Sequence, residues 1–115
     1  MSDTRVIFAT GSRKRAVARL RLRENGRGLV YVNGMRPLEY FGREDLVIHA
    51  LEPLKIAGID KPVDIICKVE GGGKAGQAGA MRLALARALK AMDENLTEVL
   101  KKYRMFSRDP REKER

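Results

Sequence analysis

The chain has 115 residues, with 24 Lys and Arg against 15 Asp and Glu, a net charge of +9 and a pI of about 10.1. This length favours a single domain with one hydrophobic core, and the positive charge favours a polyanion such as nucleic acid or an anionic membrane. The sequence has no long apolar run, no secretory signal pattern and no lipidation motif, so we expect a soluble, intracellular protein without a membrane partner.

Cys67 and His49 are the only cysteine and the only histidine. A disulfide within the chain is therefore excluded, and a Cys/His metal site has too few ligands. No pair of carboxylates is placed for acid–base catalysis, so we expect no enzyme activity, no metal and no cofactor. The six aromatic residues include no tryptophan, which favours contacts with phosphate and with nucleic-acid shape over a broad base-stacking platform.

The first predicted elements are two strands joined by a basic corner. Residues 6–10 favour a short strand that ends at Gly11-Ser12, and Arg13, Lys14 and Arg15 follow. Residues 16–23 alternate with a period of two, which is typical of a strand with one packed face. The other face carries three cations: Arg19, Arg21 and Arg23. Cations about 6 to 7 Å apart repel one another unless an anion neutralises them, so this face is a candidate for phosphate contact.

The next segment contains turns, a third strand and a helix. The Asn25-Gly26 pair predicts a hairpin from the second strand to a returning strand at 29–32. A short helical turn is expected at 37–41, followed by a helix at 43–51 that stops before Pro53.

A glycine-rich turn follows the fourth predicted strand, residues 63–70, and precedes the longest predicted helix, residues 76–92. Glycines reach positive φ at low cost, and the free amides and dipole at a helix start attract anions. The candidate phosphate contacts here are Gly71, Gly72, Gly73, Lys74, Gly76, Gln77 and Arg82.

The glycine spacing allows two other interpretations. Gly71, Gly73 and Gly76 match a dinucleotide fingerprint, but no strand is predicted after the helix to carry the required acid. Alternatively, the turn is a connection that binds nothing. A nucleotide-binding domain and a minimal core with generic RNA affinity therefore remain open beside RNA-phosphate binding.

The sequence ends in a short helix around 96–100 and a basic segment. We expect a globular domain at 1–103 and a basic extension at 104–115, whose candidate RNA contacts are Arg104, Arg108, Arg111, Lys113 and Arg115. The whole pattern predicts an α+β, two-layer sandwich with a four-stranded sheet and the helices on one face.

Five stretches, in order and spacing, resemble the bacterial-type ribosomal protein S-nine family of the small subunit: ATGSRKRAVAR (9–19), VNG (32–34), GGGKAGQA (71–78), RAL (87–89) and SRDPR (107–111). The resemblance implies the ribosomal protein S-five domain-two-like fold and a cytoplasmic, ribosomal location. It also implies an RNA-binding structural protein of the small-subunit head that supports head assembly and translation. The implied partners are small-subunit ribosomal RNA and neighbouring small-subunit proteins.

By position, the same resemblance implies RNA contacts at Arg13, Lys14, Arg15, the glycine turn with Gln77, and the segment 104–115. Members of this family typically continue in a Lys/Arg-rich tail that reaches towards transfer RNA. This sequence ends at Arg115, so transfer RNA contact is not assigned to it. We expect the isolated chain to be a monomer.

Overall fold

The computed structural model describes residues 5–59 and 61–106, and these residues form four strands and five helical segments. The strands are β1 (Val6–Arg13), β2 (Ala16–Arg23), β3 (Val30–Val32) and β4 (Asp64–Glu70). The helical segments are α1 (Pro37–Phe41), α2 (Glu44–Ala57), α3 (Lys74–Met92), the 3-10 turn η1 (Glu94–Leu96) and α4 (Thr97–Lys102).

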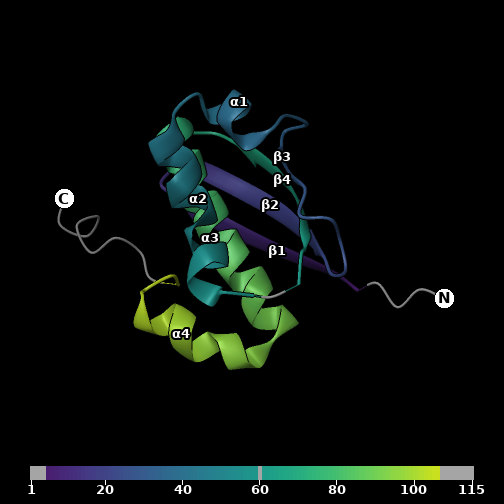
Figure 1. Ribbon diagram of the computed structural model, residues 1–115. Helices are drawn as coiled ribbons and strands as arrows, with labels where there is room; N and C mark the ends of the chain where they lie inside the picture. The colour runs from purple at the N-terminus through teal and green to yellow at the C-terminus, as the bar shows by residue number, and fades with distance from the viewer. Residues whose placement is uncertain (1–4, 60, 107–115) are drawn as a thin grey trace.

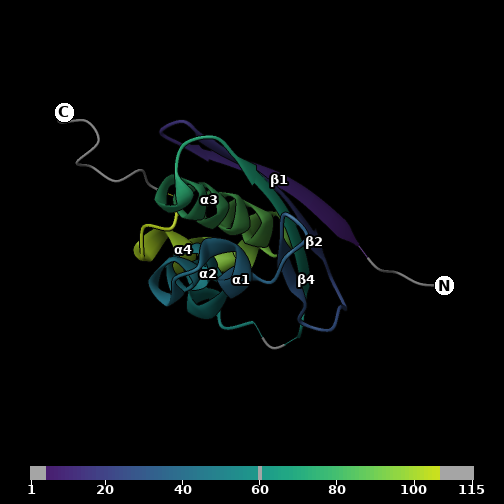
Figure 2. The same ribbon diagram turned by 90° about the horizontal axis from the view of Figure 1, so that it is seen from above.

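The strands form one sheet in the order β1-β2-β4-β3, and the helices lie together on one of its faces (Figure 1, Figure 2). β2 is antiparallel to both β1 and β4, whereas β3 and β4 are parallel. α3 packs across β1 and β2, and α2 packs against α3. The predicted two-layer α+β architecture with a four-stranded sheet is confirmed.

Alternate residues of β2 and β4 build the buried face of the sheet, as their period of two predicts. The buried residues are Ala16, Ala18, Leu20 and Leu22 from β2, and Ile65, Cys67 and Val69 from β4. Small buried residues of α3 belong to the same core: Ala78, Ala80, Ala84, Ala86 and Ala88. Because the sheet covers one side of α3 and α2 covers another, α3 is buried over more than a single stripe. Cys67, the one cysteine of the sequence, is 1% exposed on this face.

β1 is longer than predicted, because Gly11-Ser12 does not break it. The strand continues to Arg13, and Gly11 pairs with Ala18 of β2. A Cβ on Gly11 would lie 2.4 Å from the carbonyl oxygen of Ala80 and 2.6 Å from the backbone nitrogen of Ala84. Only a glycine allows this close approach of α3 to β1. The interpretation of Gly11 as a strand breaker was wrong.

The predicted hairpin between β2 and β3 is also wrong, because β4 lies between them. The segment that follows β2 is held to β4 by Asp64, whose carboxylate accepts hydrogen bonds from the backbone N–H of Arg27 at 2.8 Å and of Leu29 at 3.0 Å. The Cβ of a residue at Gly26 would lie 2.3 Å from Asp64 Cγ. The turn signal at Asn25-Gly26 was correct, but it leads the chain past β4 to the far edge of the sheet.

Two helix boundaries differ from the prediction. α2 passes through Pro53 and ends at Ala57, and Gly58 caps it with a φ of 59°, which suits glycine. Pro53 lacks the N–H that would reach the carbonyl of His49, but Pro53 is buried on the same helix as Leu46 and Ala50, and this packing offsets the lost hydrogen bond. α3 begins at Lys74, which places Gly76 inside its first turn.

Candidate nucleic-acid interface

The tight turn between β1 and β2 presents the basic corner. Arg13 pairs with Ala16, so only Lys14 and Arg15 lie between the two strands, and Lys14 adopts a positive φ of 58°. The side chains of Lys14 and Arg15 are exposed. Within the described part of the chain, neither side chain makes a hydrogen bond or an ion pair, so both cations are available to an external anion.

The glycine turn lies directly beside this corner. Gly71 and Gly72 have φ of 81° and 58°, in the region that favours glycine. A Cβ on Gly71 would lie 2.4 Å from the carbonyl oxygen of Arg15. On Gly72 it would lie 3.3 Å from the backbone nitrogen of Ala16. The fold therefore brings together two features that are more than fifty residues apart in the sequence.

The start of α3 adds backbone donors to this surface. Gly73 is the N-cap and offers no side-chain cap, and the first helical hydrogen bond runs from the Gln77 N–H to the Gly73 carbonyl at 2.9 Å. The amides of residues 74–76 precede that bond and have no partner within the helix. The first turn contains no acidic residue and begins with Lys74, a cation at the positive end of the dipole. An anion bound here would accept hydrogen bonds from the unpaired amides and would offset the positive charge of Lys74.

The side chain of Gln77 is buried and makes hydrogen bonds within the protein. It is 8% exposed, its Nε2 donates to the carbonyl oxygen of Gly71 at 3.0 Å, and its Oε1 accepts from the hydroxyl of Tyr40 at 2.5 Å. Lys74 Nζ donates to the carbonyl oxygen of Tyr40 at 3.1 Å and lies 4.5 Å from the centre of the Tyr40 ring. Both side chains attach α1 to the glycine turn.

Arg82 lies away from the glycine turn, and its Nε donates to Glu52 of α2 at 3.1 Å. Its side chain is 20% exposed. Arg13 runs along α3, where the Cβ of a residue at Gly79 would lie 2.5 Å from Arg13 Cδ. His49 lies near these charges: burial lowers its pKa most, Arg82 and Arg13 lower it further, and Glu52 opposes them. The arrangement indicates that Arg82 links α2 to α3.

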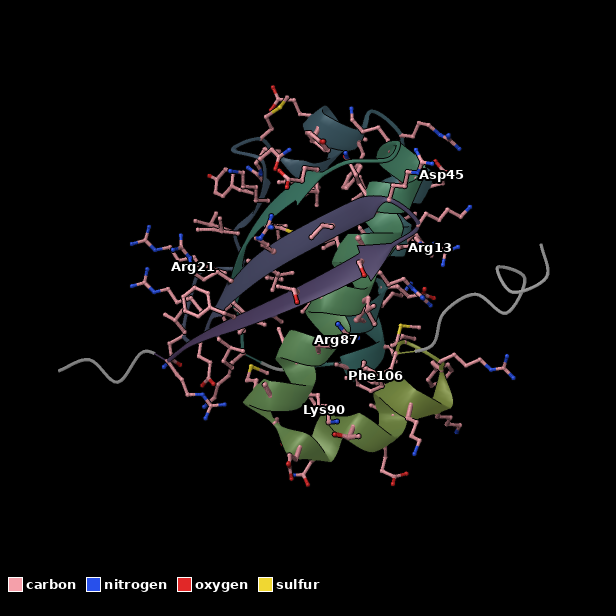
Figure 3. All side chains as sticks on the ribbon, turned by 180° about the vertical axis from the view of Figure 1, so that it is seen from behind. Arg13, Arg21, Asp45, Arg87, Lys90 and Phe106 are labelled. Carbon is pink, nitrogen blue, oxygen red and sulfur yellow. The ribbon has the colours of Figure 1, made fainter. Side chains whose placement is uncertain are left out.

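The cations of β2 point to the sheet face that carries no helix, which Figure 3 shows from behind with Arg21 labelled. Arg19 Nη1 lies 3.3 Å from Glu70 of β4, and both side chains are 58% exposed. Arg21 is exposed and makes no ion pair within the described residues. Lys68 pairs in register with Arg19 and belongs to the same surface, although we did not predict it as a site residue. Its outward parity in β4 was the signal that could have identified it.

The C-terminal candidates are only partly covered by the structure. Arg104 is exposed and has a positive φ of 62°. Met105 is buried after it, and Lys90 Nζ lies 5.7 Å from the centre of the Phe106 ring (Figure 3). Arg108, Arg111, Lys113 and Arg115 lie outside the described residues.

The acidic and thiol groups that could support nucleotide binding or catalysis have structural roles or stay protonated. Asp93, the acidic residue that directly follows α3, accepts a hydrogen bond from the Asn95 N–H at 2.9 Å and caps η1. Burial raises the pKa of the Cys67 thiol to about 12, which keeps it protonated. Among residues 5–59 and 61–106, no cluster of three metal-ligating side chains occurs, and no helix combines the length and apolar character needed to cross a bilayer.

Comparison with known proteins assigns the family. The model of the family "Ribosomal protein S9/S16" matches residues 11–115. A protein of Thermotoga neapolitana named small ribosomal subunit protein uS9 is 50% identical over 111 residues, covering 94% of this chain and 82% of the relative. The protein of the same name from Thermotoga maritima is 47% identical over 118 residues, covering 100% of this chain and 87% of the relative. The chain therefore belongs to the ribosomal protein S9/S16 family.

Proposed function

We propose that this chain is a structural, non-enzymatic constituent of the small ribosomal subunit and that it binds the ribosomal RNA of the subunit head. The observation that carries the RNA-binding part is the contact between the basic corner and the glycine turn. Gly71 lies against the Arg15 carbonyl with no room for a side chain. This contact gathers Lys14, Arg15 and the start of α3 into one positively charged surface.

The chemistry of this surface suits phosphate. The guanidinium of Arg15 and the ammonium of Lys14 supply charge, and the amides at the start of α3 supply directed donors. Within the described residues, no carboxylate neutralises either cation of the turn. RNA phosphates placed along such a surface would release counterions, which makes the binding strongly dependent on salt.

The residues divide into two roles in this proposal. Lys14, Arg15, Arg21 and the glycine-turn amides contact RNA, whereas Gln77 and Arg82 hold the surface in place through Tyr40 and Glu52. Lys74 and Arg19 serve both roles, because each is exposed although it has a partner within the chain.

The partners and location follow the family. The chain works on the cytoplasmic ribosome, beside neighbouring small-subunit proteins, and is a monomer when isolated. The globular domain at 1–103 carries the surface described above. The segment 104–115, with Arg104, Arg108, Arg111, Lys113 and Arg115, adds further RNA contacts as a basic extension. Contact with transfer RNA is not included.

A competition experiment tests the proposal. The full chain is bound to a labelled RNA fragment of the small-subunit head, and unlabelled head fragment or bulk transfer RNA is added. We expect the head fragment to compete at far lower concentration than transfer RNA. Equal competition would show that the chain is a core with only generic RNA affinity, and it would contradict the proposal. Titration with nucleoside triphosphates in a calorimeter is the control, and tight binding there would favour a nucleotide site.

A further inference from the structure

The helix-free face of the sheet carries a row of apolar and cationic side chains. The proposed phosphate binding does not explain the apolar ones. The strand register aligns Phe8 with Arg21, Arg21 with Ile66, and Ile66 with Tyr31, so the row crosses all four strands. Phe8 is 73% exposed and Ile66 is 45% exposed. Within the described residues the only contact between aromatic rings joins Tyr40 and Phe41, so the Phe8 ring has no aromatic partner.

The surface is hollowed on both sides of this row. One hollow, of about 500 Å³, is lined by Val6, Phe8, Arg21, Arg23, Asp64 and Ile66. Another, of about 320 Å³, has Phe8, Arg19, Arg21, Ile66 and Lys68 among its lining residues. Phe8, Arg21 and Ile66 therefore form a ridge between two open hollows, both of which contain cations.

The charges of this face favour an anionic occupant. Of its two carboxylates, Asp64 accepts backbone hydrogen bonds and Glu70 is paired with Arg19. The cations Arg21, Arg23 and Lys68 have no ion pair closer than 4 Å among the described residues. In an acidic protein segment, the carboxylates and an apolar group that could cover the ring lie on separate residues. A nucleotide carries a phosphate and a flat base on one unit, and Phe8 stands directly opposite Arg21, where side chains on neighbouring strands are about 5 Å apart at Cβ.

The face is also continuous with the proposed RNA surface. β2 starts at the basic corner and carries its arginines from there along the open face. In RNA-binding sheets, aromatic side chains on the open face stack unpaired bases, while basic side chains hold the backbone. RNA that leaves the corner along β2 would therefore pass over Phe8.

We propose that the open face of the sheet binds unpaired RNA, with a base stacked on Phe8 and flanking phosphates held by Arg21, Arg23 and Lys68. This inference rests on the proposed RNA-binding function and adds to it one position where the protein contacts a base. For the rest of the surface, we still expect phosphate and shape contacts to dominate.

The absence of tryptophan from the sequence makes a direct test possible. The Phe8→Trp variant of the full chain carries a single indole, which a stacked base would quench. Ile48→Trp is the matched control, because Ile48 is 65% exposed on α2. A single-stranded RNA of about eight nucleotides and a duplex of the same length serve as probes, and fluorescence anisotropy of labelled RNA reports binding separately.

We expect the single-stranded RNA to quench the indole at position 8, whereas the duplex should not, and the indole at position 48 should respond to neither. In the natural background, Phe8→Leu should weaken single-stranded RNA binding about tenfold without changing its salt dependence. Arg21→Gln should instead lower the salt slope by about one.

Two results would overturn the inference while leaving the proposed function intact. One is an unquenched indole at position 8 in a variant that still binds head RNA. The other is a blue shift without quenching in the assembled subunit, measured as the difference from a subunit that carries Phe8, which would assign this face to a protein neighbour. Failure of the natural chain to bind the head fragment would instead contradict the proposed function itself.

Discussion

The buried side-chain amide of Gln77 donates a hydrogen bond to the carbonyl oxygen of Gly71 at 3.0 Å, across the first turn of α3. Because the Tyr40 hydroxyl donates to the other end of the same amide, the glycine turn, α1 and α3 are joined at one side chain. Gln77 therefore fixes the shape of the surface that we propose for RNA.

Replacing Gln77 with Leu should separate a structural role from direct RNA contact. The change leaves the Gly71 carbonyl and the Tyr40 hydroxyl without their partner, and we expect the free energy of unfolding to fall by about 1–3 kcal/mol. Urea unfolding monitored by circular dichroism measures this loss. Tyr40→Phe is the control and should cost less, since it removes only one of the two hydrogen bonds. A Gln77→Leu variant of natural stability with weakened RNA binding would show that the side chain contacts RNA directly.

Gly11 should be intolerant of even one added methyl group. In Gly11→Ala the new Cβ would lie 2.4 Å from the Ala80 carbonyl oxygen, so β1 and α3 must separate. Overpacking of this kind costs about 1–3 kcal/mol, and the midpoint of urea unfolding should fall accordingly. Gly73→Ser is the control, because a Cβ at that position would meet no atom within 4 Å and serine is a good N-cap. Equal stability of the two variants would contradict the close approach of α3 to β1.

Gly71→Ala should weaken RNA binding through the fold of the surface. The residue has φ of 81°, and its Cβ would lie 2.4 Å from the Arg15 carbonyl oxygen, so the glycine turn and the basic corner are forced apart. We expect lower stability together with reduced affinity for head RNA, measured by unfolding and by anisotropy. Gly42→Ala also has a positive φ but meets no neighbour, and it should lose stability with little change in affinity. Unchanged affinity in folded Gly71→Ala would argue against the two turns forming one surface.

Asp64 should make part of the stability depend on acid pH. Hydrogen bonds from the backbone N–H of Leu29, and next from that of Arg27, lower the pKa of its carboxyl below the ordinary value of 3.8. A lowered folded-state pKa means that this contribution is fully present above the unfolded value and is lost as the pH falls through the folded one. The difference in unfolding free energy between the natural chain and Asp64→Ala should be constant from about pH 5 to 7 and should shrink below about pH 4. A difference that stays unchanged as the pH falls below about pH 4 would contradict the role of the charged carboxylate.

The parts of the fold that the sequence predicts well are those set by local pattern. The period of two in β2 and β4 identifies their buried faces, and the run of alanines and leucines after Gly76 identifies α3. The turn at Asn25-Gly26 is real as well. Its consequence was mispredicted because strand pairing is not local: β4, more than thirty residues later, pairs with β2 and displaces β3 to the edge.

In the candidate site too, local features are predictable from the sequence and long-range contacts are not. The sequence identifies the basic corner and the glycine turn separately, but it cannot show that the Arg15 carbonyl lies against Gly71. It also cannot separate Lys14, which has no partner in the described part of the chain, from Arg82, which is paired with Glu52. Both side chains carry one positive charge, and only the tertiary contacts distinguish a binding cation from a structural one.

The dependence of head-RNA affinity on salt is the most direct test of the central claim that this surface binds RNA phosphates. If about six phosphates are contacted, the affinity of the natural chain should fall about a thousandfold between 50 and 200 mM salt. Lys14→Gln should lower the magnitude of the slope by about one, whereas Lys55→Gln, the same charge change at an exposed position in the last turn of α2, should leave it unchanged. Affinity that is insensitive to salt, or equal slopes for the two variants, would contradict the account.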